Sequence, residues 1–228
     1  MLGVNLGLRP DRALRVLCVG AHSDDIEIGC GATMLKLARS YPSLQVRWVV
    51  LSADETRAAE ARAGAEAFLR RVTQCQILVQ GFRDGYFPYQ GAEIKAWFTQ
   101  LAAFDPDLIF THSRNDLHQD HRLVNELTWN TFRDHMILEY EIPKYDGDLG
   151  TRNFYVQLDH ELCWQKVDHL LNCFVTQRDK PWFSAETFLG LMRLRGIEAR
   201  SPSGYAEAFY CRKIVLSGLG PAGAGEAV

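Results

Sequence analysis

The chain has 228 residues, of which 47% are hydrophobic, so it can bury a full core, and its length fits one domain. Its formal net charge is −3 and its pI is about 6.2, which excludes the basic surface typical of nucleic-acid-binding proteins. No apolar run approaches the ~20 residues needed to cross a bilayer.

The cysteines and the start of the sequence indicate a cellular compartment. The six cysteines are scattered without a C-x-x-C pair, and Cys18 and Cys75 lie in or beside apolar runs, where we expect buried free thiols. The first twenty residues lack a signal-peptide pattern. We therefore expect a soluble, cytoplasmic protein without a membrane span or a nucleic-acid partner. The sequence leaves open whether the chain forms a homo-oligomer.

The first part of the chain alternates predicted strands with predicted helices. Apolar runs predict strands at residues 16–20, 46–52, 77–80 and 108–111, and helical patterns lie between them at 27–39, 56–71 and 92–104. This alternation indicates an α/β fold whose mainly parallel central sheet has helices on both faces.

The second part of the chain has a weaker pattern. It predicts strands and helices in the order strand 137–142, strand 154–158, helix 161–174, helix 182–194 and strand 208–216. We expect an irregular lead-in over residues 1–12, one domain over residues 1–216, and a flexible Gly- and Ala-rich tail over residues 217–228.

Polar side chains follow the first predicted strand directly. His22, Asp24 and Asp25 lie between this strand and the next helix, at the edge of an open α/β sheet where ligands bind. His22 and Asp25 offer a nitrogen and a hard oxygen to one divalent metal, and Asp24 between them can point elsewhere. The alternative is that residues 23–25 only cap the helix and that His22 is an ordinary loop histidine.

A second polar cluster follows the predicted strand at 108–111. Three of the seven histidines and two aspartates fall within ten residues there: His112, Asp116, His118, Asp120 and His121. His118 and His121 share a face if they lie in a first helical turn. Alternatively, either aspartate is a helix cap and His112 only supports its neighbours. Because parallel strands end at the same edge, we expect both clusters to converge on one metal site.

These motifs carry a family resemblance. Residues 21–25 (AHSDD) resemble the A-H-P-D-D signature of the zinc-dependent PIG-L/LmbE-like N-acetyl-sugar deacetylases, and residues 118–121 (HQDH) resemble their H-x-D-H motif. Residues 57–62 (RAAEAR) and 205–209 (YAEAF) resemble two further elements, so the resemblance covers about residues 15–216. Ser23 replaces the usual proline, which is a spacer. Asp116 stands where some members carry a tyrosine that helps to polarise the carbonyl.

The resemblance implies a Rossmann-like three-layer fold and an enzyme that removes an acetyl group from an N-acetylated sugar. The substrate class is an N-acetylglucosamine-type glycoside, glycoconjugate or sugar-containing metabolite, so the partner is a small molecule. The implied metal ligands are His22, Asp25 and His121, which bind Zn²⁺ and also suit Fe²⁺ or another divalent metal. Three protein ligands leave one position for water.

The resemblance also implies roles for the neighbouring side chains. Asp24 takes the proton of the attacking water as general base. His118 stabilises the oxyanion or protonates the leaving amine, and Asp120 orients it. Arg57 reaches the sugar or a carboxylate near the metal, and the alternative is a surface ion pair with Glu55 or Glu60.

An aromatic loop, residues 81–89, follows the third predicted strand at the same edge. We expect Tyr86, Phe87 and Tyr89 to form a rim that stacks on the sugar, and Tyr86 and Tyr89 are the predicted substrate-binding residues. The alternative is that these rings pack into the core or into a subunit interface.

Two other function classes fit part of the pattern. A nucleotide-binding α/β oxidoreductase would share the fold, but residues 29–34 (GCGATM) lack the final glycine of G-x-G-x-x-G. Two carboxylates at the strand end would also repel a pyrophosphate. A non-catalytic metal- or sugar-binding protein has no need of Asp24, an unliganded carboxylate beside the metal.

Overall fold

The computed structural model describes residue 3 and residues 12–215. Apart from residues 3 and 12, the expected lead-in and the expected tail lie outside the described residues. Seven strands form one sheet in the order β3-β2-β1-β4-β5-β7-β6 within the described chain. The strands are β1 (Arg15–Gly20), β2 (Gln45–Val50), β3 (Gln74–Val79), β4 (Leu108–His112), β5 (Met136–Tyr140), β6 (Phe154–Leu158) and β7 (Tyr205–Cys211).

The sheet is parallel from β3 to β5, and β7 is antiparallel to both of its neighbours. From β1 the chain proceeds outward to β2 and β3 and then returns to β4 on the other side of β1. Val16 of β1 therefore lies opposite Leu108 of β4. This reversal of strand order is the topological switch point at which open α/β sheets bind ligands. The two polar clusters follow these two neighbouring strands.

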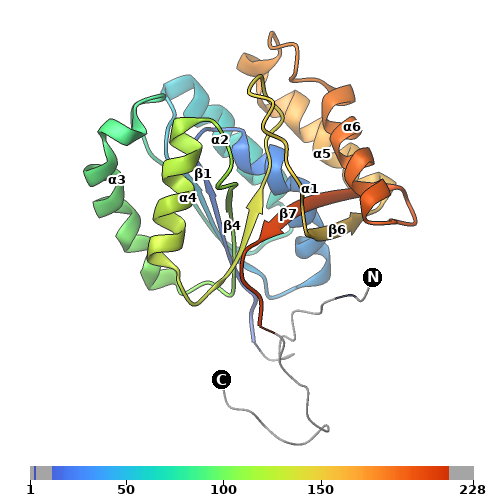
Figure 1. Ribbon diagram of the computed structural model, residues 1–228, viewed down its shortest axis with the longest axis horizontal. Helices are drawn as coiled ribbons and strands as arrows, with labels where there is room; N and C mark the ends of the chain where they lie inside the picture. Colours follow the sequence, from blue (N-terminus) through green and yellow to red (C-terminus); the bar gives the residue numbers. More distant parts are fainter. Residues whose placement is uncertain (1–2, 4–11, 216–228) are drawn as a thin grey trace, which may run out of the picture.

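The helices form a layer on each face of the sheet (Figure 1). In β1, Val16 and Cys18 face one core, whereas Leu17 and Val19 face the other, so the strand is apolar without interruption. The three-layer α/β fold expected from the sequence is confirmed. One layer holds α3 (Gly91–Phe98) and α4 (Gln119–Thr131), and the other holds α1 (Asp25–Ser40), α2 (Glu55–Phe68), α5 (His160–Cys173) and α6 (Ala185–Glu198).

Several element bounds differ from the sequence expectation. The helix expected at 92–104 is α3 followed by the 3₁₀ helix η2 (Thr99–Phe104). Helix α6 starts three residues later than expected because Ser184 caps it, its side chain accepting a hydrogen bond from Thr187 N–H. Strand β7 starts earlier, at Tyr205, where it pairs with Leu158 of β6. Two shorter 3₁₀ helices are η1 (Phe87–Tyr89) and η3 (Val175–Gln177).

Cysteine burial matches the expectation at one position and not at the other. Cys18 is buried in β1, but Cys75 is exposed. Strand β3 is the edge of the sheet, and its first three residues are exposed, so the apolar run there does not imply burial. No helix in the described part of the chain is long and apolar enough to span a membrane.

Helix α1 is interrupted at Cys30, whose φ is −142° and ψ is 16°. The break frees the N–H groups of the second half, and the Glu207 carboxylate of β7 accepts hydrogen bonds from Ala32 N at 3.0 Å and Thr33 N at 2.6 Å. Lys166 of α5 pairs with Glu207 at 2.6 Å and donates to the freed Ile28 carbonyl at 2.5 Å. Glu207 and Lys166 therefore form a buried ion pair that satisfies backbone groups on both sides of the break in α1.

Gly29 lets the first turn of α1 approach the sheet closely. A Cβ atom at this position would lie 2.3 Å from the Tyr140 ring, closer than such atoms approach. The Tyr140 hydroxyl donates to the Val19 carbonyl at 2.7 Å, which fixes the ring beneath the turn. The segment that carries the first polar cluster is thus held from two sides.

Candidate metal centre

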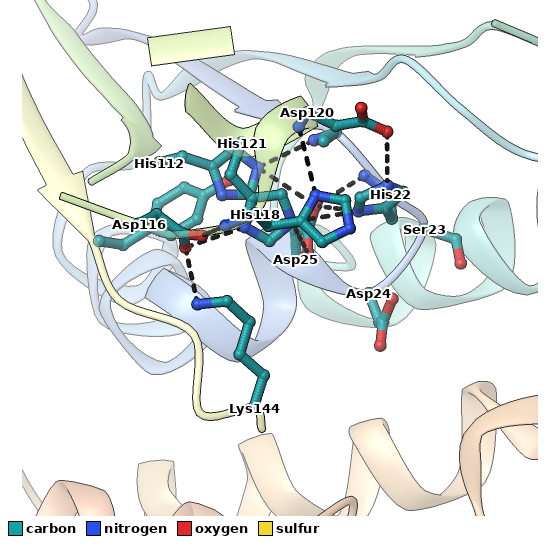
Figure 2. Close-up of polar contacts among 12 residues, drawn as sticks. His22, Ser23, Asp24, Asp25, His112, Asp116, His118, Asp120, His121 and Lys144 are labelled. Carbon is teal, nitrogen blue, oxygen red and sulfur yellow. Dashed lines mark hydrogen bonds and ion pairs between the residues drawn. The ribbon is translucent and has the colours of Figure 1, made fainter. Parts of the chain in front are cut away.

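The two polar clusters converge at the switch point (Figure 2). His22 Nδ1 lies 3.1 Å from His121 Nε2 and 3.4 Å from Asp25 Oδ2, and His121 Nε2 lies 3.6 Å from Asp25 Oδ1. Ligand atoms at about 2.0–2.2 Å from a tetrahedral zinc are roughly 3.3–3.6 Å apart. The spacing and chemistry of these donors therefore fit a single divalent cation, which His22, Asp25 and His121 would hold.

Each histidine points one ring nitrogen at this shared position and directs the other to a carboxylate. His121 Nδ1 lies 2.9 Å from Asp116 Oδ2, and His22 Nε2 lies 3.0 Å from Asp84 Oδ1 and 3.4 Å from Asp120 Oδ2. A carboxylate accepts the N–H of a neutral imidazole, which leaves a lone pair on the opposite nitrogen. This arrangement is typical of histidines that bind metal.

The charges of the site leave room for a cation. Burial lowers the pKa of His121 to about 4, so its ring is neutral at pH 7. Burial alone would also lower the pKa of His22, but Asp25, Asp120 and Asp84 outweigh it and raise that pKa well above its ordinary value. Burial opposes ionisation of Asp25, yet the surrounding histidines hold its pKa well below the usual range. A positive charge is therefore stabilised between these groups, as a proton or as a metal.

His112 is closer to the centre than the sequence indicated. It is fully buried at the end of β4, its ring stacks on that of His121 at 3.8 Å, and its Nε2 lies 3.2 Å from Asp25 Oδ2. Three further sets of donors overlap the proposed ligands and could also hold an ion: Asp25 with His112 and His121, His22 with His118 and His121, and His22 with Asp84 and Asp120. In the sequence, the three histidines within residues 112–121 already indicated that several imidazoles would lie close together here.

Asp24 turns away from the histidines (Figure 2). It occupies the N-cap position of α1 but makes no side-chain cap hydrogen bond, so the capping alternative does not describe it. Its carboxylate accepts from Arg57 Nη2 at 2.7 Å, and Arg57 Nε donates to Ser23 Oγ at 2.8 Å. The ion-pair partner of Arg57 is therefore Asp24. Burial raises the pKa of Asp24, and Arg57 opposes that rise.

His118 and Asp120 lie at the start of α4, and both are close to His22. His118 is the N-cap residue, and its Nδ1 accepts from Asp120 N at 3.3 Å, so the proton of the neutral ring is on Nε2. Burial, with His22, lowers the pKa of His118. The Asp120 carboxylate accepts from the backbone N–H groups of Gly85 at 2.7 Å and Phe87 at 3.1 Å. The imidazole beside this carboxylate is His22, and not His118.

The aromatic loop joins the site through its backbone, and its rings divide between surface and core. Tyr86 is 42% exposed and Tyr89 is 85% exposed, with their ring centroids 5.9 Å apart. Phe87 is fully buried in the core beneath α3 and α4, so its expected place in the rim is wrong. Asp84 of this loop was missed from sequence, and its hydrogen bond with His22 lowers its pKa to about 2.

The sequence profile of one family, described as GlcNAc-PI de-N-acetylase and named PIG-L, matches residues 17–132. This match covers just over half of the chain and includes both polar clusters. The chain belongs to the PIG-L family. A comparison with curated protein sequences finds no match.

Solved structures share the fold of this PIG-L protein. N,N'-diacetylchitobiose deacetylase from Pyrococcus horikoshii is 21% identical, with a TM-score of 0.68 over 86% of this chain and 83% of that chain. The zinc-inhibited form of teicoplanin deacetylase is 13% identical, with a TM-score of 0.65 over 86% and 97%. The 4-carboxy-2-hydroxymuconate hydratase from Pseudomonas putida KT2440 is 15% identical, with a TM-score of 0.73 over 90% and 98%. Identities this low establish a common fold alone.

Asp116 departs from the tyrosine that some PIG-L members carry, and its surroundings show what it does here. Its Oδ2 accepts from His121, and its Oδ1 accepts from His118 N at 2.9 Å. Burial opposes its ionisation, but these contacts and the nearby Lys144 outweigh burial and lower its pKa. Asp116 is therefore an ionised acceptor that orients His121.

Proposed function

We propose that this protein is a metal-dependent hydrolase that removes an acetyl group from an N-acetylated sugar. The observation that carries the proposal is the convergence of two imidazole nitrogens and a carboxylate within 3.1–3.6 Å at the switch point of the sheet. Membership of the PIG-L family supports it, as do structural neighbours that are named deacetylases.

In this proposal His22, Asp25 and His121 hold the metal, with Zn²⁺ as the expected ion and Fe²⁺ or another divalent ion also compatible with the donors. When bound, the metal would polarise the acetamide carbonyl and lower the pKa of a water molecule toward ~7. All six cysteines are free, which is consistent with the cytoplasmic location that we propose. We also propose that residues 1–216 form one domain.

Asp24 is the proposed general base. It is the buried carboxylate next to the ligands that takes no part in their cluster, and Arg57 stabilises its ionised form against burial. An ionised carboxylate beside the site accepts the proton of the attacking water. Because Arg57 is engaged with Asp24 and Ser23, the proposal gives it the task of holding the base, and contact with the sugar is secondary.

His118 is the proposed donor. Its neutral ring carries the proton on Nε2, so it can donate to the developing oxyanion or to the leaving amine. Asp116 cannot take over the carbonyl-polarising role of the tyrosine, because an ionised carboxylate only accepts hydrogen bonds. That role therefore passes to His118, and Asp120 assists by holding His22 and the aromatic loop.

Tyr86 and Tyr89 form the proposed sugar rim. Both are exposed on a loop whose backbone bonds Asp120, so their rings can contact the apolar face of a pyranose at the site. The rim accounts for substrate affinity, whereas the metal ligands, Asp24 and His118 account for the chemistry.

A substrate screen tests the proposal. The protein is stripped of metal, reconstituted with Zn²⁺, Fe²⁺ or Co²⁺, and mixed with N-acetylglucosamine, its glycosides and N,N'-diacetylchitobiose. We expect metal-dependent release of acetate and an equal amount of free amine from at least one of them. Full metal occupancy without acetate release from any of these compounds would favour a non-catalytic binding protein.

A further inference from the structure

Lys144 is a buried cation beside the metal centre to which none of the steps above assigns a role. It lies on the loop after β5, and its side chain is only 9% exposed. Its Nζ is 3.1 Å from Asp116 Oδ2, the same oxygen that accepts the hydrogen bond from His121 Nδ1 (Figure 2). Only one residue therefore separates this ammonium group from a proposed metal ligand.

A second carboxylate fixes where Lys144 points. Asp148, four residues later on the same loop, forms an ion pair with the Lys144 ammonium. The same carboxylate accepts a hydrogen bond from Leu117 N at 2.8 Å, next to Asp116 in the chain. These contacts join the loop after β5 to the segment before α4, so they fix the position of the ammonium group beside Asp116.

The charges around His121 explain why a cation is needed there. The imidazole lies between two carboxylates, Asp25 and Asp116, and all three side chains are nearly buried. A buried carboxylate without a hydrogen-bonded cationic partner is costly, so the Asp116 side chain would turn toward another partner if it stood alone. The ammonium group lies 3.1 Å from Oδ2, the same oxygen that faces His121 Nδ1, and it holds the carboxylate in this orientation.

We propose that Lys144 is a positioning residue of the metal centre, which holds Asp116 so that this carboxylate aims His121 Nε2 at the position shared with His22 and Asp25. The inference rests on the metal site of the proposed function. If Lys144 only joined the two loops, its loss would not change the affinity for metal. As a positioning residue, it does affect that affinity.

A double-mutant cycle on metal binding tests this inference. Zn²⁺ affinity is measured by competition with a chromophoric chelator for the wild type, Lys144→Met, Asp116→Asn and the double variant. Loss of a partner that orients a metal-binding histidine typically costs about 10–100-fold in affinity. We expect Asp116→Asn to weaken binding within that range and Lys144→Met to weaken it about tenfold. The double variant should bind like Asp116→Asn, because Lys144 acts through that carboxylate.

Three further measurements separate positioning from general stability. Lys144→Arg should restore affinity to near the wild-type value, because it keeps the charge. The visible spectrum of the Co²⁺-substituted protein should shift in Lys144→Met, because it reports the ligand geometry. Lys36→Met is the matched control, because the Lys36 ammonium group donates to the Gln157 carbonyl and contacts no residue of the metal centre. It should change neither readout. Lys144→Gln takes the place of Lys144→Met if thermal melting shows that the latter does not fold.

Wild-type Zn²⁺ affinity and an unchanged Co²⁺ spectrum in Lys144→Met would overturn the inference and leave Lys144 as a loop tie. Fully additive losses in the double variant would overturn it as well, since Lys144 would then act independently of Asp116. A wild-type chain that binds no metal would contradict the proposed function itself, so the two failures are distinguishable.

Discussion

The Nδ1 atom of His22 lies 3.1 Å from the Nε2 atom of His121, although the two residues are 99 positions apart in the chain. Their other ring nitrogens face carboxylates, so two lone pairs meet unless a proton or a cation lies between them. The parallel neighbours β1 and β4 bring these nitrogens together. The convergence follows from the order of the strands in the sheet, and the predictions below depend on it.

Replacing His121 with alanine should remove most of the bound metal and the deacetylase activity, because the change deletes one of three proposed ligands. Elemental analysis of the purified variant gives the metal content, and circular dichroism shows whether the fold persists. His135→Ala is the matched control, since His135 lies between α4 and β5, near Asp105. Full occupancy in His121→Ala would show that another donor set, such as His22 with Asp84 and Asp120, holds the ion.

Asp24→Asn tests the proposed general base. The substitution keeps the size of the side chain but removes its charge, so turnover should fall by about 10²–10⁴-fold, the usual contribution of general-base catalysis. Metal content and KM should stay close to wild type. Loss of the metal in this variant would make Asp24 a ligand, and unchanged turnover would place the base elsewhere.

The aromatic rim predicts an effect on KM. Aromatic contacts of this kind contribute about 0.5–1.5 kcal/mol, so Tyr86→Ala and Tyr89→Ala should each raise KM roughly 2–12-fold with little change in kcat. Phe87→Ala should behave differently, because its ring is buried in the core and its loss should cost about 3–5 kcal/mol of stability. Steady-state kinetics and urea unfolding separate these outcomes. If neither kinetic constant moves in the tyrosine variants, the loop is structural.

Glu27 predicts a pH dependence of stability. It is fully buried, neither carboxyl oxygen has a hydrogen-bond partner among the described residues, and burial raises its pKa well above 4.5. A carboxyl group whose pKa is higher in the folded state destabilises the fold as pH rises above its unfolded value, by up to about 1.4 kcal/mol per pH unit. The cost stops growing once pH passes the folded pKa.

Urea unfolding of the wild type and Glu27→Gln between pH 5 and pH 8 measures this effect. The free energy of unfolding of Glu27→Gln should increase relative to that of the wild type as pH rises, because the amide does not ionise. Other titrating groups are common to both proteins and cancel in the difference. A difference that stays constant over this range would mean that Glu27 has an ordinary pKa.

The sequence predicted the parts of the site that follow from local pattern and strand order. The apolar runs before residues 21 and 112 identified two parallel strands, and the parallel arrangement placed His22, Asp25 and His121 at one edge. The start of α6 was misplaced because Trp182 and Phe183 continue its apolar pattern, whereas the cap at Ser184 sets where it begins.

Contacts that form only through the tertiary fold could not be predicted from the sequence. Lys144 reaches Asp116 from a loop 28 residues away, and its sequence neighbours carry no motif. The direction of Arg57 was also open, because a helix-surface arginine has several carboxylates within reach, and only the packing of α2 beside α1 selects Asp24. Such contacts depend on how loops and helices dock, which no local periodicity specifies.

One titration shows directly whether the convergence of His22, Asp25 and His121 makes a catalytic metal centre. Metal-stripped protein is titrated with Zn²⁺, Fe²⁺ or Co²⁺ in the presence of an N-acetylated sugar that the intact protein deacetylates, while bound metal and released acetate are measured together. The proposal predicts that acetate release is absent without metal and rises in proportion to occupancy, reaching its maximum at one ion per chain. Deacetylation at full rate by the metal-stripped protein would contradict it.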